Sequence, residues 1–404
     1  MASSSASSVL KPLFVTHVAL ASALGHGAAA AFDALVRGHG GLRRNDFLDC
    51  ALDTCIGRVD GVESEEIPAE LAAFDCRSSR LGQLGLRQDR FFEAVARARS
   101  EYGPDRIGVF IGTSSSGILS AELGYRARDA VTGALPARLG FRETYNLFSV
   151  TDFVRRRLHL AGPASTISSA CSSSAKAFAA AARAIAAGLC DAAVVGGVET
   201  LCFTTLHGFA SLELLSRQPC RPCDAMRDGI SIGEAAGYAL LEPRDARSDA
   251  LAFLGYGETS DAYHMSTPHP EGLGAARAMR QALASARLAA RDIDYINLHG
   301  TGTRNNDAAE DAAVGSVFTS DVPCSGTKGW TGHTLGAAGA LEAILTLLCL
   351  RHGYVPGTLN TVHPDPALKC RIVLEGTHRN IRRAMSNSFG FGGSNCSLIF
   401  GRAE

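Results

Sequence analysis

A short polar stretch followed by a long alanine-rich segment constrains this chain more than any other feature. Residues 166–176 read Thr-Ile-Ser-Ser-Ala-Cys-Ser-Ser-Ser-Ala-Lys, and the segment 172–188 carries only Lys176 and Arg183 as charged residues. An apolar helix of this kind is usually buried. The pattern therefore predicts a buried helix over 172–188, with Cys171 at its N-terminus.

Cys171 is a candidate nucleophile because of this position. Backbone N–H groups at a helix N-terminus have no intrahelical partner, and the helix dipole is positive at that end. Both effects favour a thiolate, which is the reactive form of cysteine. The alternative is a small buried cysteine of the core, and on this stretch alone the two interpretations are evenly balanced.

The composition is that of an ordinary globular protein. The 404 residues are 46% hydrophobic and 20% charged with a formal net charge of -1, which allows a large core or two fused halves and gives no reason to expect nucleic-acid binding. Twelve scattered cysteines indicate reduced thiols and a cytoplasmic location. The C-x-x-C pair Cys220 and Cys223 lacks a second pair or a nearby histidine, so we interpret it as non-functional.

The N-terminal region imitates a signal peptide. Residues 1–10 are predicted to be disordered, and an apolar run follows Lys11, but His17 interrupts that run. We therefore predict a core strand here, then a turn at 25–27 and a helix from Ala28. No uninterrupted apolar run reaches membrane-spanning length.

Short apolar strands alternate with helices along the rest of the chain. This alternation indicates α/β layers with largely parallel strand pairing. The two halves, 11–245 and 246–404, show a similar order of elements without a repeat of identical residues. Strands are predicted at 106–112, 191–197, 237–242, 251–257, 293–298, 372–374 and 396–400, and helices at 81–99, 273–288 and 335–350.

Three further stretches are unusual for a scaffold. His299-Gly-Thr-Gly-Thr303 ends a predicted strand, and strand ends are where such sheets bind ligands. Residues 326–339 form a glycine-punctuated loop with Lys328 and His333, and residues 387–395 carry glycines that let backbone N–H groups approach a ligand. Each stretch alone is explained as well by turns and structural histidines; together with Cys171 they favour a catalytic site.

With these motifs the chain resembles the β-ketoacyl-acyl carrier protein synthases, the condensing enzymes of fatty acid and polyketide synthesis. The resemblance implies a thiolase-like α/β fold, usually dimeric, in which two similar α/β halves form alternating helix and sheet layers (αβαβα). It implies neither a metal nor a cofactor, because the substrates arrive on the phosphopantetheine arm of acyl carrier protein. The matching stretches are Ser-Ala-Cys171-Ser-Ser-Ser, 260–265, 299–303, 328–339 and 387–393, in the same order across almost the whole chain.

The resemblance also implies roles for the central residues. Cys171 takes the acyl chain from a carrier thioester, and His299 and His333 assist malonyl decarboxylation and stabilise the enolate that forms. The backbone N–H groups of Cys171 and Phe391 form the oxyanion hole. Lys328 pairs with the buried carboxylate of Glu342 and organises the histidines.

Further positions follow from the same resemblance. Thr301 and Thr303 hydrogen-bond the phosphopantetheine arm, and Phe391 gates the pocket beside Phe389. The expected substrate-binding set is Thr301, Thr303, Phe389, Phe391, Ser115 and Phe209, and the expected structural support is Glu342, Asp307 and Glu310.

Three residues depart from the family pattern. Glu213 stands where related enzymes tend to carry a basic residue for docking the acidic carrier, which puts the usual docking mode in doubt. Ser115 stands at the loop position that controls the depth of the acyl pocket, and a small polar residue there suggests an altered pocket. Cys223 replaces an aromatic residue.

The loop 260–272, the pair Asn306 and Asp307, and the short N-terminal half resemble ketosynthases of aryl-polyene and xanthomonadin-type pigment clusters. The expected partners are acyl carrier protein and either a second copy or a chain-length-factor-like subunit that lacks the cysteine. The alternatives are a housekeeping fatty acid ketosynthase I/II and the non-catalytic partner subunit itself. A thiolase would need a second catalytic cysteine, and Cys396 lies inside a predicted strand.

Overall fold

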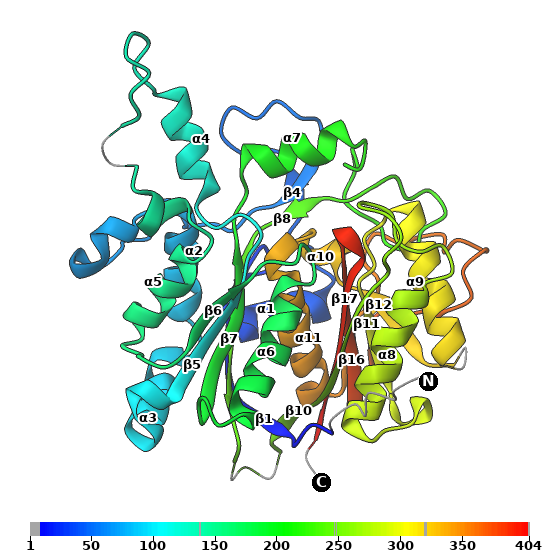
Figure 1. Cartoon of the computed structure of the whole chain (residues 1–404). Helices are drawn as coiled ribbons and strands as arrows, with labels where there is room; N and C mark the ends of the chain where they lie inside the picture. Colours follow the sequence, from blue (N-terminus) through cyan, green and yellow to red (C-terminus); the bar gives the residue numbers. More distant parts are fainter. Residues whose placement is uncertain (1–8, 137–138, 246, 248, 319–320, 403–404) are drawn as a thin grey trace.

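Two β-sheets joined edge to edge form the centre of the protein (Figure 1), in a computed structural model that describes residues 9–136, 139–245, 247, 249–318 and 321–402. The sheets meet where β1 pairs with β10 over only two residue pairs, Leu13 with Phe253 and Phe14 with Ala252. The first sheet has the order β1 (Leu13–Ser22), β9 (Ala235–Glu242), β7 (Ala192–Glu199), β5 (Ile107–Gly112), β6 (Ala164–Ile167). The second has the order β10 (Leu251–Ser260), β17 (Ser394–Arg402), β16 (Arg383–Gly390), β11 (Tyr295–Leu298), β12 (Pro323–Gly326), β14 (Arg371–Ile372).

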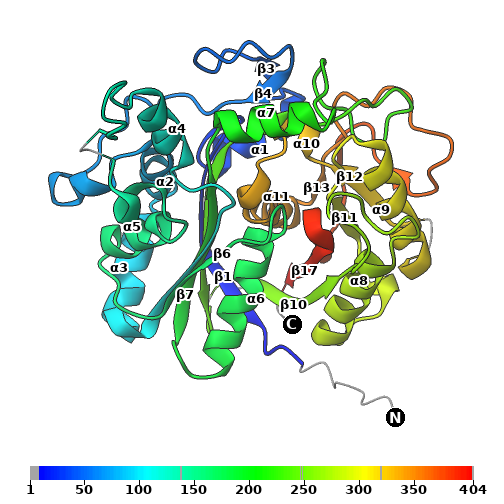
Figure 2. The same ribbon diagram turned by 45° about the horizontal axis from the view of Figure 1, so that its top comes forward.

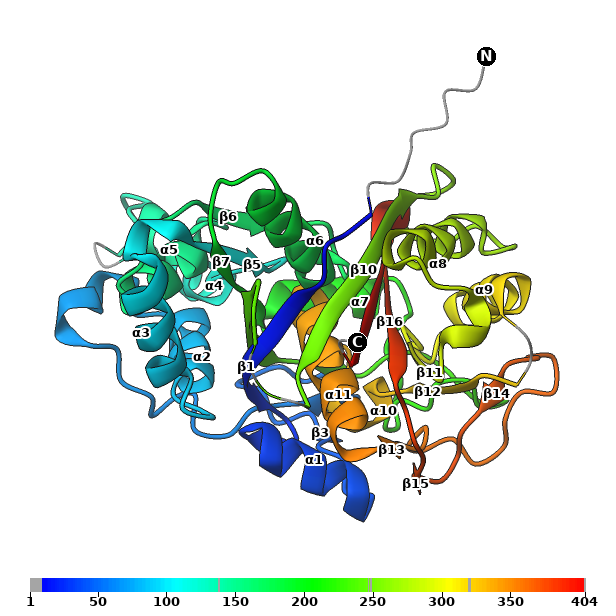
Figure 3. The same cartoon turned by 90° about the horizontal axis from the view of Figure 1, so that it is seen from below.

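Helices form three layers around these sheets. Helices α6 (Ser173–Ala186) and α11 (Ala338–His352) pack against each other between the sheets, as the view from below shows (Figure 3). Helices α2 (Arg77–Leu86), α3 (Phe91–Tyr102) and α5 (Ser149–Arg157) cover the outer face of the first sheet, and α8 (Leu273–Ala286) and α9 (Arg304–Val317) cover that of the second. The predicted thiolase-like αβαβα order of layers is confirmed.

Smaller elements complete the chain. The remaining helices are α1 (Ala28–Arg37), α4 (Ile118–Arg126), α7 (Phe203–Ser211) and α10 (Lys328–Thr331). Short strands lie at β2 (Gly25–His26), β3 (Arg43–Arg44), β4 (Cys55–Gly57), β8 (Ile232–Gly233), β13 (Tyr354–Val355) and β15 (Thr377–His378).

The two central helices are the ones with the most apolar sequences. The ring of Phe178 on α6 packs edge-on against Phe253 and Phe400 of the second sheet, both at 5.7 Å between ring centroids. The stretch Leu335–His352, with mean hydropathy 1.3, is long and apolar enough to cross a membrane, but 89% of it is buried inside the protein. The predicted helices at 172–188 and 335–350 are therefore confirmed as core helices.

The single helix predicted at 81–99 is wrong, because α2 and α3 are separate. Asp89 and Arg90 between them have left-handed backbone, with φ of 54° and 57°. Both carboxylate oxygens of Asp89 accept the backbone N–H of Ala28 at 3.0 Å, at the start of α1. The chain thus breaks the helix at Asp89, where this carboxylate caps a different helix.

The expectation of largely parallel pairing is also wrong. Parallel pairs join β5 to β6 and β7, and β11 to β12 and β16, but β1, β9, β10 and β17 pair antiparallel with their neighbours. Only residues 391–393 connect β16 to β17. A connection this short permits a hairpin and not the crossover that parallel strands require.

The N-terminal strand and helix lie where the sequence predicts them. β1 is the strand that borders both sheets, and α1 begins at Ala28. Of the predicted disordered segment, residues 1–8 lie outside the described residues, and the N–H of Leu10 donates to the carbonyl of Ser285 at 3.0 Å. The boundary between halves at 245/246 stays a prediction.

Candidate active site

Cys171 lies immediately before Ser172, the N-cap residue of α6. The turn that leads to it contains Ala170 in left-handed backbone, with φ of 53°. Gly390, the last residue of β16, packs against this turn so closely that a Cβ there would lie 3.1 Å from the Cys171 nitrogen and 3.0 Å from the Ser169 oxygen. A side chain at Gly390 would force this turn to shift, and the backbone N–H of the next residue, Phe391, acts as a hydrogen-bond donor that lowers the pKa of the Cys171 thiol.

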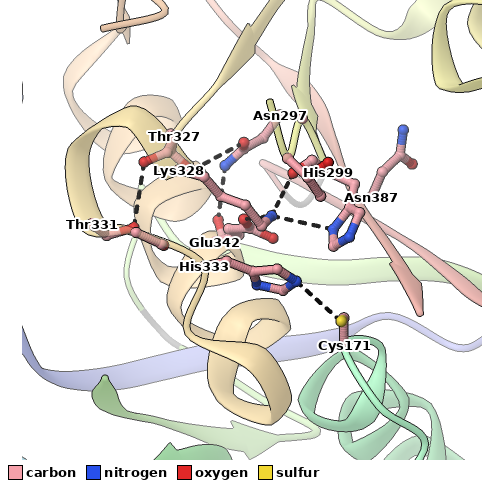
Figure 4. Close-up of polar contacts among 12 residues, drawn as sticks. Cys171, Asn297, His299, Thr327, Lys328, Thr331, His333, Glu342 and Asn387 are labelled. Carbon is pink, nitrogen blue, oxygen red and sulfur yellow. Dashed lines mark hydrogen bonds and ion pairs between the residues drawn. The ribbon is translucent and has the colours of Figure 1, made fainter. Parts of the chain in front are cut away.

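The side chains of Cys171, His299 and His333 meet at one point (Figure 4). Nε2 of His333 lies 3.0 Å from Sγ of Cys171, and the two imidazole rings are 5.3 Å apart and nearly perpendicular. The sulfur atom and one nitrogen of each ring all lie within 4.8 Å of one another. The three residues come from the start of α6, the end of β11 and the loop before α11, so segments far apart in the sequence build the site.

Hydrogen bonds at the other ring nitrogens define the tautomers of the two histidines. The backbone N–H of Leu335 donates to Nδ1 of His333 at 3.2 Å, and the ammonium of Lys328 lies 3.2 Å from Nδ1 of His299. Both Nδ1 atoms therefore act as acceptors, and each neutral ring carries its proton on Nε2. Burial, together with the charge of Lys328, holds the pKa of both histidines well below the usual range. The site thus presents two neutral N–H donors.

Lys328 is 1% exposed, and its three ammonium protons have three acceptors. These are Nδ1 of His299, the backbone carbonyl of His299 and the carboxylate of Glu342. A buried ammonium is stable only when it is paired in this way. Burial raises the pKa of Glu342 to about 7 although Lys328 lowers it. The predicted pairing of Lys328 with Glu342 is present.

Burial opposes the thiolate expected at Cys171. The side chain is buried, and burial raises the pKa of its thiol to about 11, although the charge of Lys328 and the Phe391 N–H lower it. The cost of burying an anion exceeds the stabilisation from these groups. Burial therefore disfavours the thiolate at Cys171, and the Nε2–H of His333, 3.0 Å from the sulfur, is placed to stabilise the anion as it forms.

Two buried carboxylates hold the loop 299–303. Glu310 accepts the N–H groups of His299 and Gly300 at 2.8 Å each, and Asp307 accepts those of Thr301 at 3.0 Å and Gly302 at 3.2 Å. Burial raises the pKa of both carboxyls, that of Glu310 to about 7. These contacts are consistent with structural support, which stays a prediction for both residues.

A cavity of about 430 Å³ contains the three reactive side chains. Five of the six expected binding residues line it: Thr301, Thr303, Phe209, Phe389 and Phe391. The Phe209 and Phe391 rings lie 5.6 Å apart, and Phe209 belongs to α7, which crosses between the two halves (Figure 2). Glu213 also lines the cavity and is exposed.

Ser115 is the exception among the expected binding residues. It is absent from the lining of this cavity, and its hydroxyl and backbone N–H both bind the carboxylate of Glu199. Its role in pocket depth stays a prediction. Cys223 is buried, and the thiol of Cys220 donates to the carbonyl of Thr301 at 3.1 Å.

Cysteine and histidine are zinc ligands, so the cluster has the residue types of a metal site. Zinc would need an unprotonated nitrogen from each ring. Nε2 of His333, which faces Cys171, carries a proton because Nδ1 of that ring already accepts a hydrogen bond, and Nδ1 of His299 is occupied by the ammonium of Lys328. The donor pattern therefore fits an oxygen anion better than a cation.

Sequence reasoning missed some residues that support the site. The Leu335 N–H on His333 and the Asn387 amide, which donates to Glu310 at 3.2 Å, are two of them. Every residue except proline has a backbone N–H, so the identity of residue 335 does not reveal the bond to His333. The glycine-rich composition of 332–339 is the one feature of the sequence that indicates such a contact. Asn387 lay inside a motif that was recognised for its glycines.

The sequence is similar to those of known condensing enzymes. The models "Beta-ketoacyl synthase, N-terminal domain" and "Beta-ketoacyl synthase, C-terminal domain" match residues 86–246 and 252–362. The chain is 40% identical over 334 residues to 3-oxoacyl-[acyl-carrier-protein] synthase 2 of Rhizobium meliloti, covering 76% of this chain and 77% of that protein.

Solved structures are similar over nearly the whole chain. One is the ketosynthase ApeO in complex with its chain length factor ApeC from Xenorhabdus doucetiae, with TM-score 0.87, 38% identity, and 97% and 98% of the two chains covered. Another is the ishigamide ketosynthase/chain length factor, with TM-score 0.88, 25% identity, and 98% and 100% covered. The chain therefore belongs to the β-ketoacyl synthase family, the acyltransferases that condense substrates carried on acyl carrier protein.

Proposed function

We propose that the chain holds an acyl group on Cys171 and joins it to a two-carbon unit from malonyl carrier protein. In the first step the Cys171 sulfur attacks the acyl thioester, and the proton of its thiol leaves with the phosphopantetheine thiol of the carrier. The oxygen of the tetrahedral intermediate faces the backbone N–H groups of Cys171 and Phe391. Support comes from the Phe391 N–H, which is already in contact with Cys171.

In the second step the first carrier has left with its phosphopantetheine arm, and malonyl thioester occupies the same part of the cavity. Its thioester oxygen accepts the Nε2–H groups of His299 and His333, and loss of carbon dioxide leaves an enolate on that oxygen. The enolate carbon then attacks the acyl carbonyl and expels the Cys171 sulfur as a thiolate, which takes a proton from solvent to restore the thiol. Two donors aimed at an oxygen whose charge grows during the reaction stabilise the transition state more than the ground state.

The single observation that carries this proposal is the meeting of Cys171, His299 and His333 within 4.8 Å. Lys328 acts by holding Nδ1 of His299, and Thr301 and Thr303, whose hydroxyls lie 2.9 Å apart, face the phosphopantetheine arm. Among the described residues no second cysteine lines the cavity, which argues against thiolase chemistry.

The test is acylation of the protein. A cysteine-directed inhibitor of the cerulenin type should form an adduct at Cys171, located by mass spectrometry of the digested protein. If the adduct forms at another residue, or does not form, the result would favour the alternative that this chain is a non-catalytic partner subunit. The enzyme is expected in the cytoplasm, where twelve free cysteines persist.

We further propose that the substrates are aryl-polyene-type chains and that a chain-length-factor-like subunit is the partner. The partner is supported by the 38% identity to a ketosynthase solved in complex with its chain length factor. The substrate class is supported by the resemblance of the loop 260–272 and of Asn306 and Asp307 to aryl-polyene ketosynthases. The test is co-expression with a cysteine-free homologue from the same gene cluster. A stable heterodimer that extends an aryl acyl carrier, and does so faster than a saturated one, is the expected result.

The housekeeping fatty acid enzyme is the second candidate, favoured by the 40% identity to 3-oxoacyl-[acyl-carrier-protein] synthase 2 of Rhizobium meliloti. It predicts a homodimer that extends saturated acyl carriers. Arg304, exposed at the mouth of the cavity, is the cation we propose for the acidic carrier, because Glu213 at the same mouth would repel it.

A further inference from the structure

A buried carboxylate outside the predicted site, Glu199, lies between the two halves. Glu199 is the last residue of β7 and is 0% exposed. It accepts the backbone N–H groups of Ser114 at 2.6 Å, Ser115 at 3.0 Å and Gly336 at 2.9 Å. Ser114 and Ser115 follow β5 in the first half, whereas Gly336 belongs to the turn after His333 in the second.

Both oxygens of Glu199 act as acceptors. Oε2 faces the N–H groups of Ser114 and Gly336, and Oε1 faces that of Ser115. Backbone N–H groups can only donate, so these three bonds define the role of the carboxylate. The hydroxyls of Ser114, Ser115 and Thr113 also contact it.

The Gly336 contact leads directly to a reactive side chain. Leu335 has left-handed backbone, with φ of 48°, and its N–H donates to Nδ1 of His333 at 3.2 Å. The next N–H along the chain, that of Gly336, is the one bound by Glu199. A Cβ on Gly336 would lie 2.5 Å from Oε2 of Glu199 and 2.5 Å from the Ser114 nitrogen, so the turn packs on the carboxylate without spare room.

We propose that Glu199 is a positioning residue for His333. Glu199 anchors the turn 334–336 to the loop 113–115. The anchored turn holds the Leu335 N–H against Nδ1 of His333, and the ring proton therefore stays on Nε2, which faces Cys171. The kinetic part of this inference rests on the proposed function. The tautomer part depends only on the geometry of the turn.

Glu199→Gln is the direct test, because glutamine has nearly the same shape. In either amide orientation its NH₂ group opposes at least one backbone N–H, of Ser115 or of Ser114 and Gly336. We expect ¹⁵N-histidine NMR, with His333 assigned by comparison with a His333→Ala protein, to show loss of the pure Nε2–H signature. In a Cys171→Gln background, we expect kcat for malonyl decarboxylation to fall roughly 10- to 100-fold, with KM within about twofold.

Glu122→Gln is the matched control. Its carboxylate accepts the N–H groups of Phe203 at 3.0 Å and Thr204 at 2.6 Å at the start of α7 and has no recorded contact with the His333 turn. This variant should keep both the tautomer and the rate. If Glu199→Gln does not fold, Gly336→Ala disrupts the same contact from the other side and should give the same two changes.

A Glu199→Gln protein with the wild-type His333 signature and an unchanged decarboxylation rate would overturn the proposal. A Glu199→Gln protein that differs from wild type only in its preference for acyl chains would also overturn the proposal, because Glu199 would then support the loop 113–115 and not the His333 turn. The two proposals can also fail separately. If Glu199→Gln removes the Nε2–H signature of His333, but the Cys171→Gln protein with Glu199 intact does not decarboxylate malonyl carrier protein, the positioning role stands and the proposed function is refuted.

Discussion

Nε2 of His333 lies 3.0 Å from Sγ of Cys171, although 162 positions separate the two residues in the chain. Cys171 precedes α6 and His333 precedes α11, and these two helices pack against each other between the sheets. The contact therefore depends on how the two helices of the central layer pack.

Replacing Cys171 separates the two half-reactions. Cys171→Ala should abolish condensation, because no sulfur remains to hold the acyl chain. Cys171→Gln should still decarboxylate malonyl carrier protein, since its amide imitates an acylated cysteine and leaves both imidazole donors in place. Release of labelled carbon dioxide and product mass measure the two activities. Condensation by the alanine variant would refute the nucleophile.

His299→Ala and His333→Ala should each lower decarboxylation by roughly 10²- to 10³-fold, the usual effect of losing one donor to a developing oxyanion. Acylation of Cys171 should continue in part, because the backbone N–H groups of Cys171 and Phe391 remain. Acyl-enzyme formation is followed by intact-protein mass spectrometry. Wild-type decarboxylation in both variants would contradict the role as enolate donors.

Lys328→Ala should destabilise the protein by about 3–5 kcal/mol, because it leaves the buried carboxylate of Glu342 without its cation. The double variant Lys328→Met with Glu342→Gln should regain most of this stability but not decarboxylation, since Nδ1 of His299 still lacks its donor. Urea denaturation supplies the stabilities. A single-variant cost below about 1 kcal/mol would contradict the pairing.

The raised pKa of Cys171, to about 11, predicts its reactivity toward iodoacetamide. Only the thiolate reacts, so below the pKa the alkylation rate should rise about tenfold per pH unit, from pH 7 to pH 10, without a plateau. The site is read by mass spectrometry, with Cys171→Ala as the control. A rate that is flat above pH 7 would show that the helix N-terminus outweighs burial.

The two lowered histidine pKa values predict acid sensitivity. Below about pH 6.5 the unfolded chain binds protons that the buried rings do not, so stability is present above pH 6.5 and falls as the pH drops. Urea denaturation between pH 5 and pH 8 should show this slope, and His299→Asn should reduce it. Equal slopes in both proteins would argue against neutral rings.

Much of the site was predictable because its chemistry sits in short stretches with unusual residues. Cys171, His299, Lys328 and His333 each stand beside glycines or serines that no scaffold requires, and the structure brings them together. The buried helices were predictable because apolar segments such as 172–188 have few alternatives to a core.

What escaped prediction depends on partners distant in sequence. The helix break at Asp89 follows from capping at Ala28, and Glu199 binds loops 85 and 137 positions away. The state of Cys171 could not be read from its helix position, because the depth of burial, which dominates its pKa, is set by the whole fold.

The narrow seam between β1 and β10 has a consequence for biosynthesis. β10 is completed by β17, the last strand, so a nascent chain on the ribosome carries Cys171 long before His333 and the closing strand have emerged. The sulfur therefore gains these partners only after the second half of the chain has been synthesised, and a product truncated before His333 would carry the nucleophile without that imidazole donor.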